Sequence, residues 1–303
     1  MKRITFILLL SLLFPYFLFA QKNTKKDKDY EEDFEPGVDF IIGGGVYFGG
    51  KLPAGYYSGV PTNENNLNYL FGNKYWREHD LIPLISNNNQ FVSSTDTGIC
   101  VKYPDGYPMD MHYKPAMSIS IGASYRFTPH IRLSIYYSFA RLTAKDIFLV
   151  SYTQLVSGNE RADYLQYLLV GKENRSLIDL TLSYTFHPSK IVKPFIEIGG
   201  EFNFVRVKSF QAVIENKEFN LLDIYGGSIY NGGYMQEFKP RYGGAGGAVM
   251  AAAGIKFAFN KSISVDPTFY VSYGTINLKD YKGGHFNFGA YIRLVMSDSI
   301  FQK

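Results

Sequence analysis

The chain has 303 residues, with 31 basic and 27 acidic side chains, and Lys2 and Arg3 lie in its N-terminal leader. Without these two, 29 basic residues balance 27 acidic ones, which does not favour nucleic acid as a partner. The single Cys100 excludes an internal disulfide framework.

The first 20 residues predict a cleaved signal peptide. Two basic residues precede an apolar run at 4–19, which is too short to span a bilayer in the usual way, and Ala20 precedes a polar shift. An N-terminal membrane anchor is the alternative. Position 21 is Gln, so no cysteine is present there for a lipid. Residues 21–36 form a mixed-charge segment, for which we expect a disordered periplasmic tail, followed by one domain at 37–303.

Eight later segments have the period-two alternation of strands. In one of them Met117, Ile119 and Ile121 alternate with Ser118 and Ser120. Proline is disfavoured inside a sheet, so Pro267 predicts either a bulge or a strand that begins only at Thr268. The predicted strands are 37–50, 116–127, 130–142, 176–187, 193–208, 247–259, 262–274 and 285–296.

The connections between these segments alternate in length. Those at 128–130, 188–192 and 260–261 are short, whereas those at 51–115, 143–175, 209–246 and 275–284 are long. Short turns on one rim and long loops on the other are typical of outer-membrane barrels. We therefore predict an all-β fold in the bacterial outer membrane: an eight-stranded antiparallel transmembrane up-and-down β-barrel with short periplasmic turns and long extracellular loops. Residues 148–152 or 219–225 could add strands and make ten.

The two faces of the strands predict two sets of residues. Aromatic residues make up 17% of the chain, and several gather at the short-turn rim of the apolar face, where a girdle would lie. The opposite face carries charges that must pair inside a barrel of eight strands, whose interior is filled by side chains, so we predict a plugged lumen. The predicted girdle is Tyr125, Phe127, Tyr184, Phe186, Phe257 and Phe259; the predicted lumen network is Asp39, Arg126, Arg132, Asp179, Glu197, Glu201, Lys256, Asp266 and Arg293.

No motif predicts catalysis, a cofactor or a metal. His79 and His112 lie near acids in the first long loop without the spacing of paired ligands, and His285 is expected at the outer rim of the lumen. The glycine runs at 43–45 and 243–247 lack the remaining residues of nucleotide-binding loops.

The long loops are the expected place of function. The first combines many Asn with aromatic residues, a composition suited to recognition, although a lid that packs on itself is the alternative. The candidate recognition residues are Tyr56, Tyr57, Tyr75, Trp76 and Tyr107.

The strand pattern resembles the small outer-membrane barrels of the OmpA and OmpX type, and residues 116–141 and 177–200 resemble the PorT-type barrel domain. In the last strand Asn287, Gly289, Ile292 and Leu294 match the signal that the barrel assembly machinery reads in such proteins, although residues 297–303 follow it. The resemblance implies that machinery and the lipid bilayer as partners. We expect a non-enzymatic barrel whose loops contact an external ligand, polysaccharide or protein; the alternative is an accessory subunit of an outer-membrane export complex of type IX secretion.

Overall fold

The computed structural model describes residues 36–63, 65–72, 80–81, 83–85, 101–156, 159–186, 191–222, 228–231, 234–237, 242–260, 262–279 and 281–298. The predicted signal peptide and almost all of the predicted tail lie outside these residues, as do Tyr75 and Trp76.

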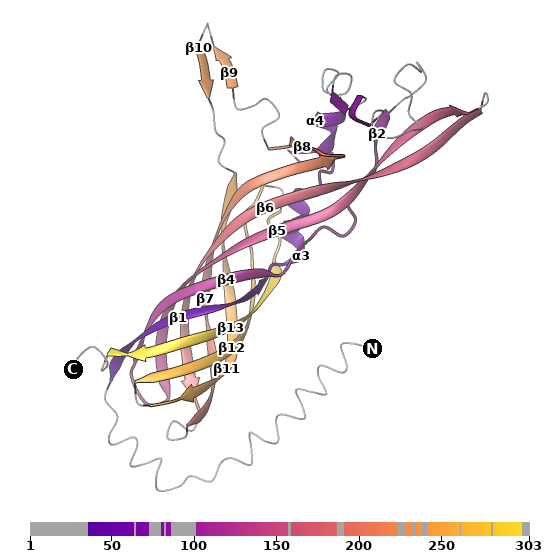
Figure 1. Cartoon of the computed structure of the whole chain (residues 1–303). Helices are drawn as coiled ribbons and strands as arrows, with labels where there is room; N and C mark the ends of the chain where they lie inside the picture. Colours follow the sequence, from indigo (N-terminus) through magenta and orange to yellow (C-terminus); the bar gives the residue numbers. More distant parts are fainter. Residues whose placement is uncertain are drawn as a thin grey trace.

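Eight strands close into a ring (Figure 1). Each pairs antiparallel with its neighbour in the order β11, β12, β13, β1, β4, β5, β6, β7, and β7 pairs back onto β11 from Arg206 to Val192. The predicted eight-stranded all-β barrel is confirmed. The ring strands are β1 (Gly37–Phe48), β4 (Ala116–Arg126), β5 (Ile131–Val156), β6 (Asn159–Thr185), β7 (Val192–Ile214), β11 (Gly243–Ala258), β12 (Ile263–Gly274) and β13 (His285–Ser297).

Shorter elements lie at the long-loop end of the ring. β2 (Val101–Gly106) and β3 (His112–Tyr113) pair with β5, and β8 (Lys217–Asn220) pairs with β7. No helix in the described part of the chain has the length and apolar character needed to cross a membrane. The remaining elements are α3 (Lys51–Ala54), η1 (Gly55–Tyr57), α4 (Leu67–Gly72), β9 (Ser228–Asn231) and β10 (Tyr234–Glu237).

The outer surface of the ring is an apolar band. Ile119 and Ile292 are 66% and 64% exposed, while Ser120 and Arg293 beside them in the same strands are buried inside. On β5 the apolar outward residues run from Ile131 to Phe139, nine residues, which matches the length that a tilted strand needs to cross a bilayer. The barrel therefore presents to its surroundings the surface that lipid tails require.

The structure corrects the predicted boundaries of β5, β6 and β7. We expected loops at 143–175 and 209–246, but β5 and β6 pair without interruption from Ile131 and Tyr184 to Val156 and Asn159. The reason is that alternation continues past the membrane band, with Phe148 and Val150 buried on one face. Residues 148–152 lie within β5, and residues 219–220 form the end of β8, so neither adds a strand to the ring; residues 223–225 lie outside the described residues.

Pro267 behaves in neither of the two ways that we expected. β12 begins at Ile263, four residues before the proline, and the pairing register with β11 is the same on either side, at Thr268 with Gly254 and at Val265 with Phe257. Both the bulge and the late start are therefore wrong. The ladder is only interrupted between those two pairs, because proline has no backbone N–H to donate.

The glycine at position 289 is required by close packing. A Cβ there would lie 2.1 Å from Cε1 of Tyr270, whereas a Cβ at Gly200 would meet no atom within 4 Å. We expect Gly289→Ala to displace the Tyr270 ring and to destabilise the barrel by about 1 to 3 kcal/mol. The measurement is heat-modifiability, in which the folded barrel runs faster on a gel than the boiled, unfolded chain. The temperature at which the faster band disappears should be lower for Gly289→Ala than for the wild type. Gly200→Ala is the matched control and should leave it unchanged; equal behaviour of the two variants would contradict the packing argument.

Candidate functional site

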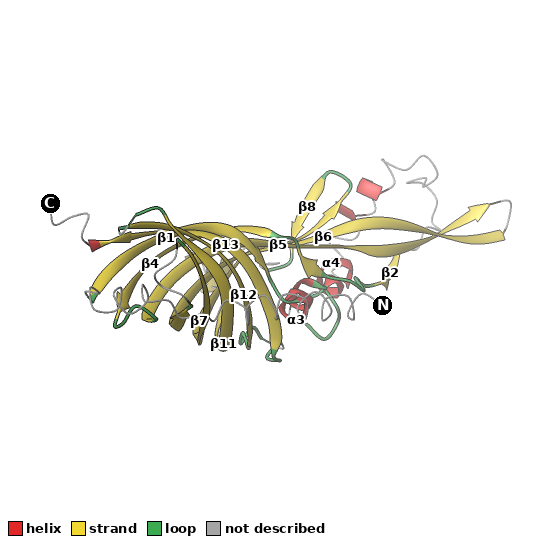
Figure 2. Ribbon diagram, turned by 90° about the horizontal axis from the view of Figure 1, so that it is seen from below, coloured by secondary structure: helices red, strands yellow, loops and turns green. Residues whose placement is uncertain are grey.

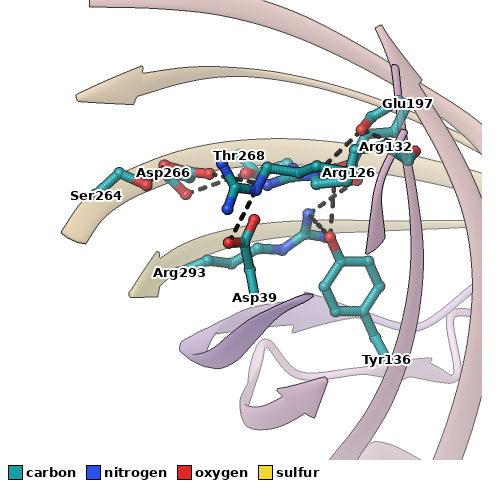
Figure 3. Close-up of polar contacts among 10 residues, drawn as sticks. Asp39, Arg126, Arg132, Tyr136, Glu197, Ser264, Asp266, Thr268 and Arg293 are labelled. Atoms are coloured by element: carbon teal, nitrogen blue, oxygen red, sulfur yellow. Dashed lines mark hydrogen bonds and ion pairs between the residues drawn. The ribbon is translucent and has the colours of Figure 1, made fainter. Parts of the chain in front are cut away.

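Six of the nine predicted lumen charges form ion pairs in the half of the barrel near the short turns: four of them are linked around Glu197, and Arg126 pairs with Asp39; the six are together called the network here (Figure 3). They come from β1, β4, β5, β7, β12 and β13, so the network crosses the lumen and does not follow one seam. Three acids match three arginines, and the network is neutral when all are ionised. Its members are Asp39, Arg126, Arg132, Glu197, Asp266 and Arg293.

Glu197 is the centre of this network. Its Oε2 accepts a hydrogen bond from Nη1 of Arg293 at 2.8 Å, and its Oε1 accepts from Nη2 of Arg132 at 3.2 Å. The hydroxyl of Tyr136 also donates to Oε1, and the guanidinium of Arg293 lies 4.3 Å from the centre of the Tyr136 ring. Buried charges need this density of partners, because an unpaired ion away from water costs several kcal/mol.

The outer pairs extend the network toward the short-turn end. Nε of Arg126 lies 3.1 Å from Oδ1 of Asp39, and its Nη2 donates to the hydroxyl of Ser297 at 2.9 Å. Nη1 of Arg132 lies 3.7 Å from Oδ2 of Asp266, which makes this pair electrostatic without a hydrogen bond.

The other three predicted lumen charges lie apart from the network. Asp179 and Glu201 face each other directly across the β6–β7 ladder, and both are buried. No ion pair to either is found among the described residues, and Glu201 accepts a hydrogen bond from the hydroxyl of Ser272 at 3.2 Å. Lys256 faces Lys193 across the β7–β11 ladder, and both line a cavity at the short-turn end together with Asp39.

A second polar cluster, which the sequence analysis missed, lies near the extracellular end. Arg175 is fully buried; its Nε donates to Oε1 of Glu173 at 2.7 Å, and its Nη1 donates to the hydroxyl of Tyr47 at 3.0 Å. The Asn287 amide oxygen accepts from Nη1 of Arg175 at 3.3 Å and from the backbone N–H of Gly50 at 2.9 Å. The cluster ties β6 to β1 and to β13 across the lumen.

The first long loop completes this cluster from above. The hydroxyls of Tyr57 and Tyr113 each donate to Oε2 of Glu173 at 2.8 Å, and the Tyr113 ring centre lies 4.8 Å from the guanidinium of Arg175. Burial is the main cause that raises the pKa of both tyrosines well above its usual value, and the negative charge of the Glu173 carboxylate is the second. They therefore remain neutral donors to the carboxylate at neutral pH.

This placement bears on the predicted recognition residues. Tyr56 and Tyr57 are buried, 5% and 0% exposed, so they cannot contact an external ligand in this conformation. The reason is that η1 turns both rings inward. The ring centre of Tyr57 lies 5.6 Å from that of Phe210, and the ring centre of Tyr56 lies 6.4 Å from that of Tyr281. Tyr107 is half-buried, and its hydroxyl donates to Asn68 at 3.1 Å. The predicted Tyr75 and Trp76 fall outside the described residues.

One signal in the sequence could have located Glu173 and Arg175. Position 173, like 175 and 177, keeps the odd-numbered alternation of Asp179, Thr181 and Ser183, all of which are buried on the lumen side. The predicted strand began only at 176, although an inward charge is compatible with a barrel strand.

The predicted girdle residues lie at the short-turn ends of β4, β6 and β11. They make close aromatic contacts, with ring centres 4.9 Å apart for Tyr125 and Phe127 and 5.0 Å apart for Tyr184 and Phe186. Phe257 and Phe259 are exposed on the outer face.

The predicted assembly residues divide between the two faces of β13. Asn287 is buried in the Arg175 cluster, and Gly289 is covered by Tyr270. Ile292 and Leu294 belong to the apolar outer band.

The described residues hold no group of three or more His, Cys, Asp or Glu side chains that could bind a metal ion. His285 is buried at the extracellular rim, with Nδ1 3.3 Å from the carbonyl oxygen of Gly283. The histidine lies beside Gly50.

No known protein family profile matches the chain, and no curated protein matches it. Among solved structures it is similar to the Neisserial surface protein NspA, with 10% identity, a TM-score of 0.39 and coverage of 87% of this chain and 99% of the other. It is also similar to Ail of Yersinia pestis, solved with a heparin analogue, with 10% identity, a TM-score of 0.32 and coverage of 86% of this chain and 98% of the other. For the outer-membrane protease OmpT of Escherichia coli the identity is 9%, the TM-score 0.30 and the coverage 86% of this chain and 95% of the other. At these TM-scores the likeness carries no inference about function. The closed ring and its apolar outer band make the chain a β-barrel protein of the outer-membrane type.

Removing the charge of either of two buried acids should change the free energy of unfolding in opposite directions. Glu197→Gln leaves two buried arginines underpaired and should lower the free energy of unfolding by about 3 to 5 kcal/mol. Asp179→Asn removes repulsion with Glu201 and should raise it by up to about 1 kcal/mol. Urea unfolding in lipid vesicles at pH 8, followed by circular dichroism, measures both changes. If Asp179→Asn destabilised as strongly as Glu197→Gln, Asp179 would have an ionic partner, contrary to the structure.

Proposed function

We propose that the chain is a non-enzymatic integral outer-membrane barrel whose interior is closed and whose extracellular part binds a partner at the cell surface. The observation that carries this proposal is the β5–β6 hairpin. Its strands continue beyond the membrane band from Arg141 to Val156 on β5, about 50 Å of extended chain. Figures 1 and 2 show the hairpin reaching past the other strands of the wall.

The hairpin is the centre of an extracellular sheet. β2 pairs with the outer part of β5, and β8 pairs with β7, which gives the order β2, β5, β6, β7, β8 above the membrane band. One face of this sheet is covered by α4, where Phe71 contacts Phe148 with ring centres 6.2 Å apart. A packed layer of this kind holds its other face in a fixed shape, which suits specific recognition.

The outer face of this sheet is available for contact. Ile147 and Tyr164 are exposed there, 47% and 54%, well above the nine-residue membrane band of β5. Rigid aromatic and aliphatic side chains on an ordered surface are typical anchors of a protein partner. These residues replace the buried Tyr56 and Tyr57 as candidates for recognition.

The two polar clusters support the proposed closure of the lumen. The Glu197 network spans one half, and the Arg175 cluster with the overlying Tyr57 and Tyr113 spans the other. In an eight-stranded barrel the side chains already fill the interior. These observations support a plugged lumen and argue against a role in diffusion of solutes.

A second candidate function is that of an accessory subunit in an outer-membrane export complex of the PorT-containing kind. The observation in its favour is that β2 and β8 end the extracellular sheet, so a strand from a partner could add to either edge. The two functions differ in partner: an external ligand for the first, membrane proteins of the same cell for the second.

The hairpin can be shortened without disturbing the core. Joining Ser151 to Tyr164 through Asn-Gly removes the tip and keeps Phe148, Val150 and Tyr167 in place. We expect cells that display this variant, with Ile147 and Tyr164 also changed to Ser, to lose binding to a panel of glycans and matrix proteins that the wild type binds, because the tip and both exposed candidate residues are then removed.

A matched control replaces residues 228–237, which hold β9 and β10, by the same Asn-Gly turn and should keep binding. If the shortened variant bound the panel as well as the wild type, and both proteins were still heat-modifiable on gels, the hairpin would not be the binding site. A loss of co-purifying membrane proteins with unchanged binding to the panel would favour the export complex.

Closure of the lumen predicts the absence of conductance. The purified wild-type protein in a planar bilayer should give no current steps above the lipid background. A variant with Arg132, Glu197 and Arg293 all changed to Ser should also stay closed, because the Arg175 cluster closes the other half separately. Adding Glu173→Ala and Arg175→Ala to that variant should produce steps. Steps from the wild type would contradict a plugged lumen.

A further inference from the structure

We propose that the outer wall of β5, β6 and β7, immediately above the apolar band, binds the phosphate groups of a glycolipid in the outer leaflet. The site consists of Arg141, Lys172, Arg206 and Lys208, named here the basic patch. All four side chains are exposed on the outer face of the ring. The site lies outside the lumen and away from the tip of the hairpin.

The position of the basic patch follows from the ladder. Phe139 on β5 and Phe204 on β7 are the last outward residues of the apolar membrane band on their strands, two positions before Arg141 and Arg206. Arg141 pairs with Asn174, and Asn174 pairs with Arg206, so the two arginines lie in one row across three strands. The wall thus changes from apolar to basic at one level on neighbouring strands, which is the level of lipid head groups.

The spacing within the basic patch suits a ligand that presents several phosphate oxygens. Neighbouring strands lie about 4.8 Å apart, so the backbones of Arg141 and Arg206 are about 10 Å apart. Lys172 faces outward in the next row, between them. The guanidinium of Arg141 lies 5.9 Å from the centre of the Phe139 ring, which holds it against the wall. Arginine binds phosphate through two parallel N–H groups, and lysine adds a point charge.

Acidic residues are absent from the outer face of the described stretches around the basic patch. Across residues 131–145, 168–185 and 191–211 the sequence has four acids, and all of them are buried on the lumen side. Within these described stretches the exposed bases therefore have no carboxylate beside them on the wall. The four acids are Glu173, Asp179, Glu197 and Glu201. The outer face of these described stretches thus carries bases without acids, which is more than a solvated surface of mixed charge requires.

A register shift contributes to the basic patch. The pairing of β6 with β7 shifts between Lys172 and Glu173, where Val207 pairs with Glu173 and Ser209 pairs with Lys172. Lys208 is the extra residue; it is exposed, and Phe210 after it is buried again. A bulge redirects side chains in this way, and here it adds a fourth base to the outer wall without removing Phe210 from the core.

The outward residues between the basic patch and the membrane favour a lipid over free phosphate as the molecule that carries the bound phosphate groups. The outward residues toward the membrane on these strands are apolar, with Ile135, Leu180 and Phe202 exposed. Between the two zones the hydroxyls of Tyr137 and Ser176 lie 3.1 Å apart on the outer face, at the height where sugar hydroxyls would be. A phosphorylated glycolipid matches this order of acyl chain, sugar and phosphate.

The test uses the purified full chain in a neutral detergent, titrated with diphosphorylated lipid A, with the same lipid after removal of both phosphates, and with inorganic phosphate. Native mass spectrometry counts the bound molecules. We expect the wild type to retain diphosphorylated lipid A, and the variant with Arg141, Lys172, Arg206 and Lys208 all changed to Gln to bind it about tenfold or more weakly. Higher salt should weaken wild-type binding.

The matched control changes Lys279 and Lys282 to Gln, two exposed bases between β12 and β13, and should bind as the wild type does. Heat-modifiability on gels checks that each variant is folded; if the fourfold variant is not, the wild-type comparison of phosphorylated with phosphate-free lipid decides alone. Equal binding of those two lipids, or an unchanged affinity in the folded fourfold variant, would overturn the proposal. Inorganic phosphate that binds as tightly as the lipid would overturn the lipid source.

Discussion

Closure of the sheet is the constraint on which the rest of this structure depends. When β7 pairs back onto β11, the edges of the sheet are removed, and the backbone can enter an apolar environment with its polar groups paired. The alternation of side chains then has two different consequences. Outward positions such as Ile119 must suit lipid, whereas inward positions such as Arg293 are buried in the interior and must find partners within it.

The two halves of the lumen meet this requirement differently. Near the short turns, charges from the wall alone neutralise one another around Glu197. Near the extracellular end the wall supplies Glu173 and Arg175, and the loop that follows β1 supplies Tyr57 and Tyr113. The second arrangement couples the loop to the barrel, so the conformation of the extracellular segment depends on a buried ion pair of the wall.

Period two predicted the ring of eight strands and most of the lumen charges, because Glu197 or Arg132 can face only one side once its apolar neighbours face the other. The same rule did not reveal where β5 and β6 end, since a strand that leaves the membrane no longer needs an apolar outer face. It also could not show that Tyr56 and Tyr57 are buried. Their position depends on contacts with Phe210 and Tyr281, which are distant in sequence.

The interruption at Pro267 gives the barrel wall an uneven resistance to local opening. Between the pair of Gly254 with Thr268 and that of Phe257 with Val265 the β11–β12 ladder is incomplete, and on the other edge of β11 the like charges of Lys256 and Lys193 face each other. β11 is thus held weakly on both edges over the same few residues. We infer that amide hydrogens there exchange with solvent through smaller openings than those in the uninterrupted β5–β6 ladder.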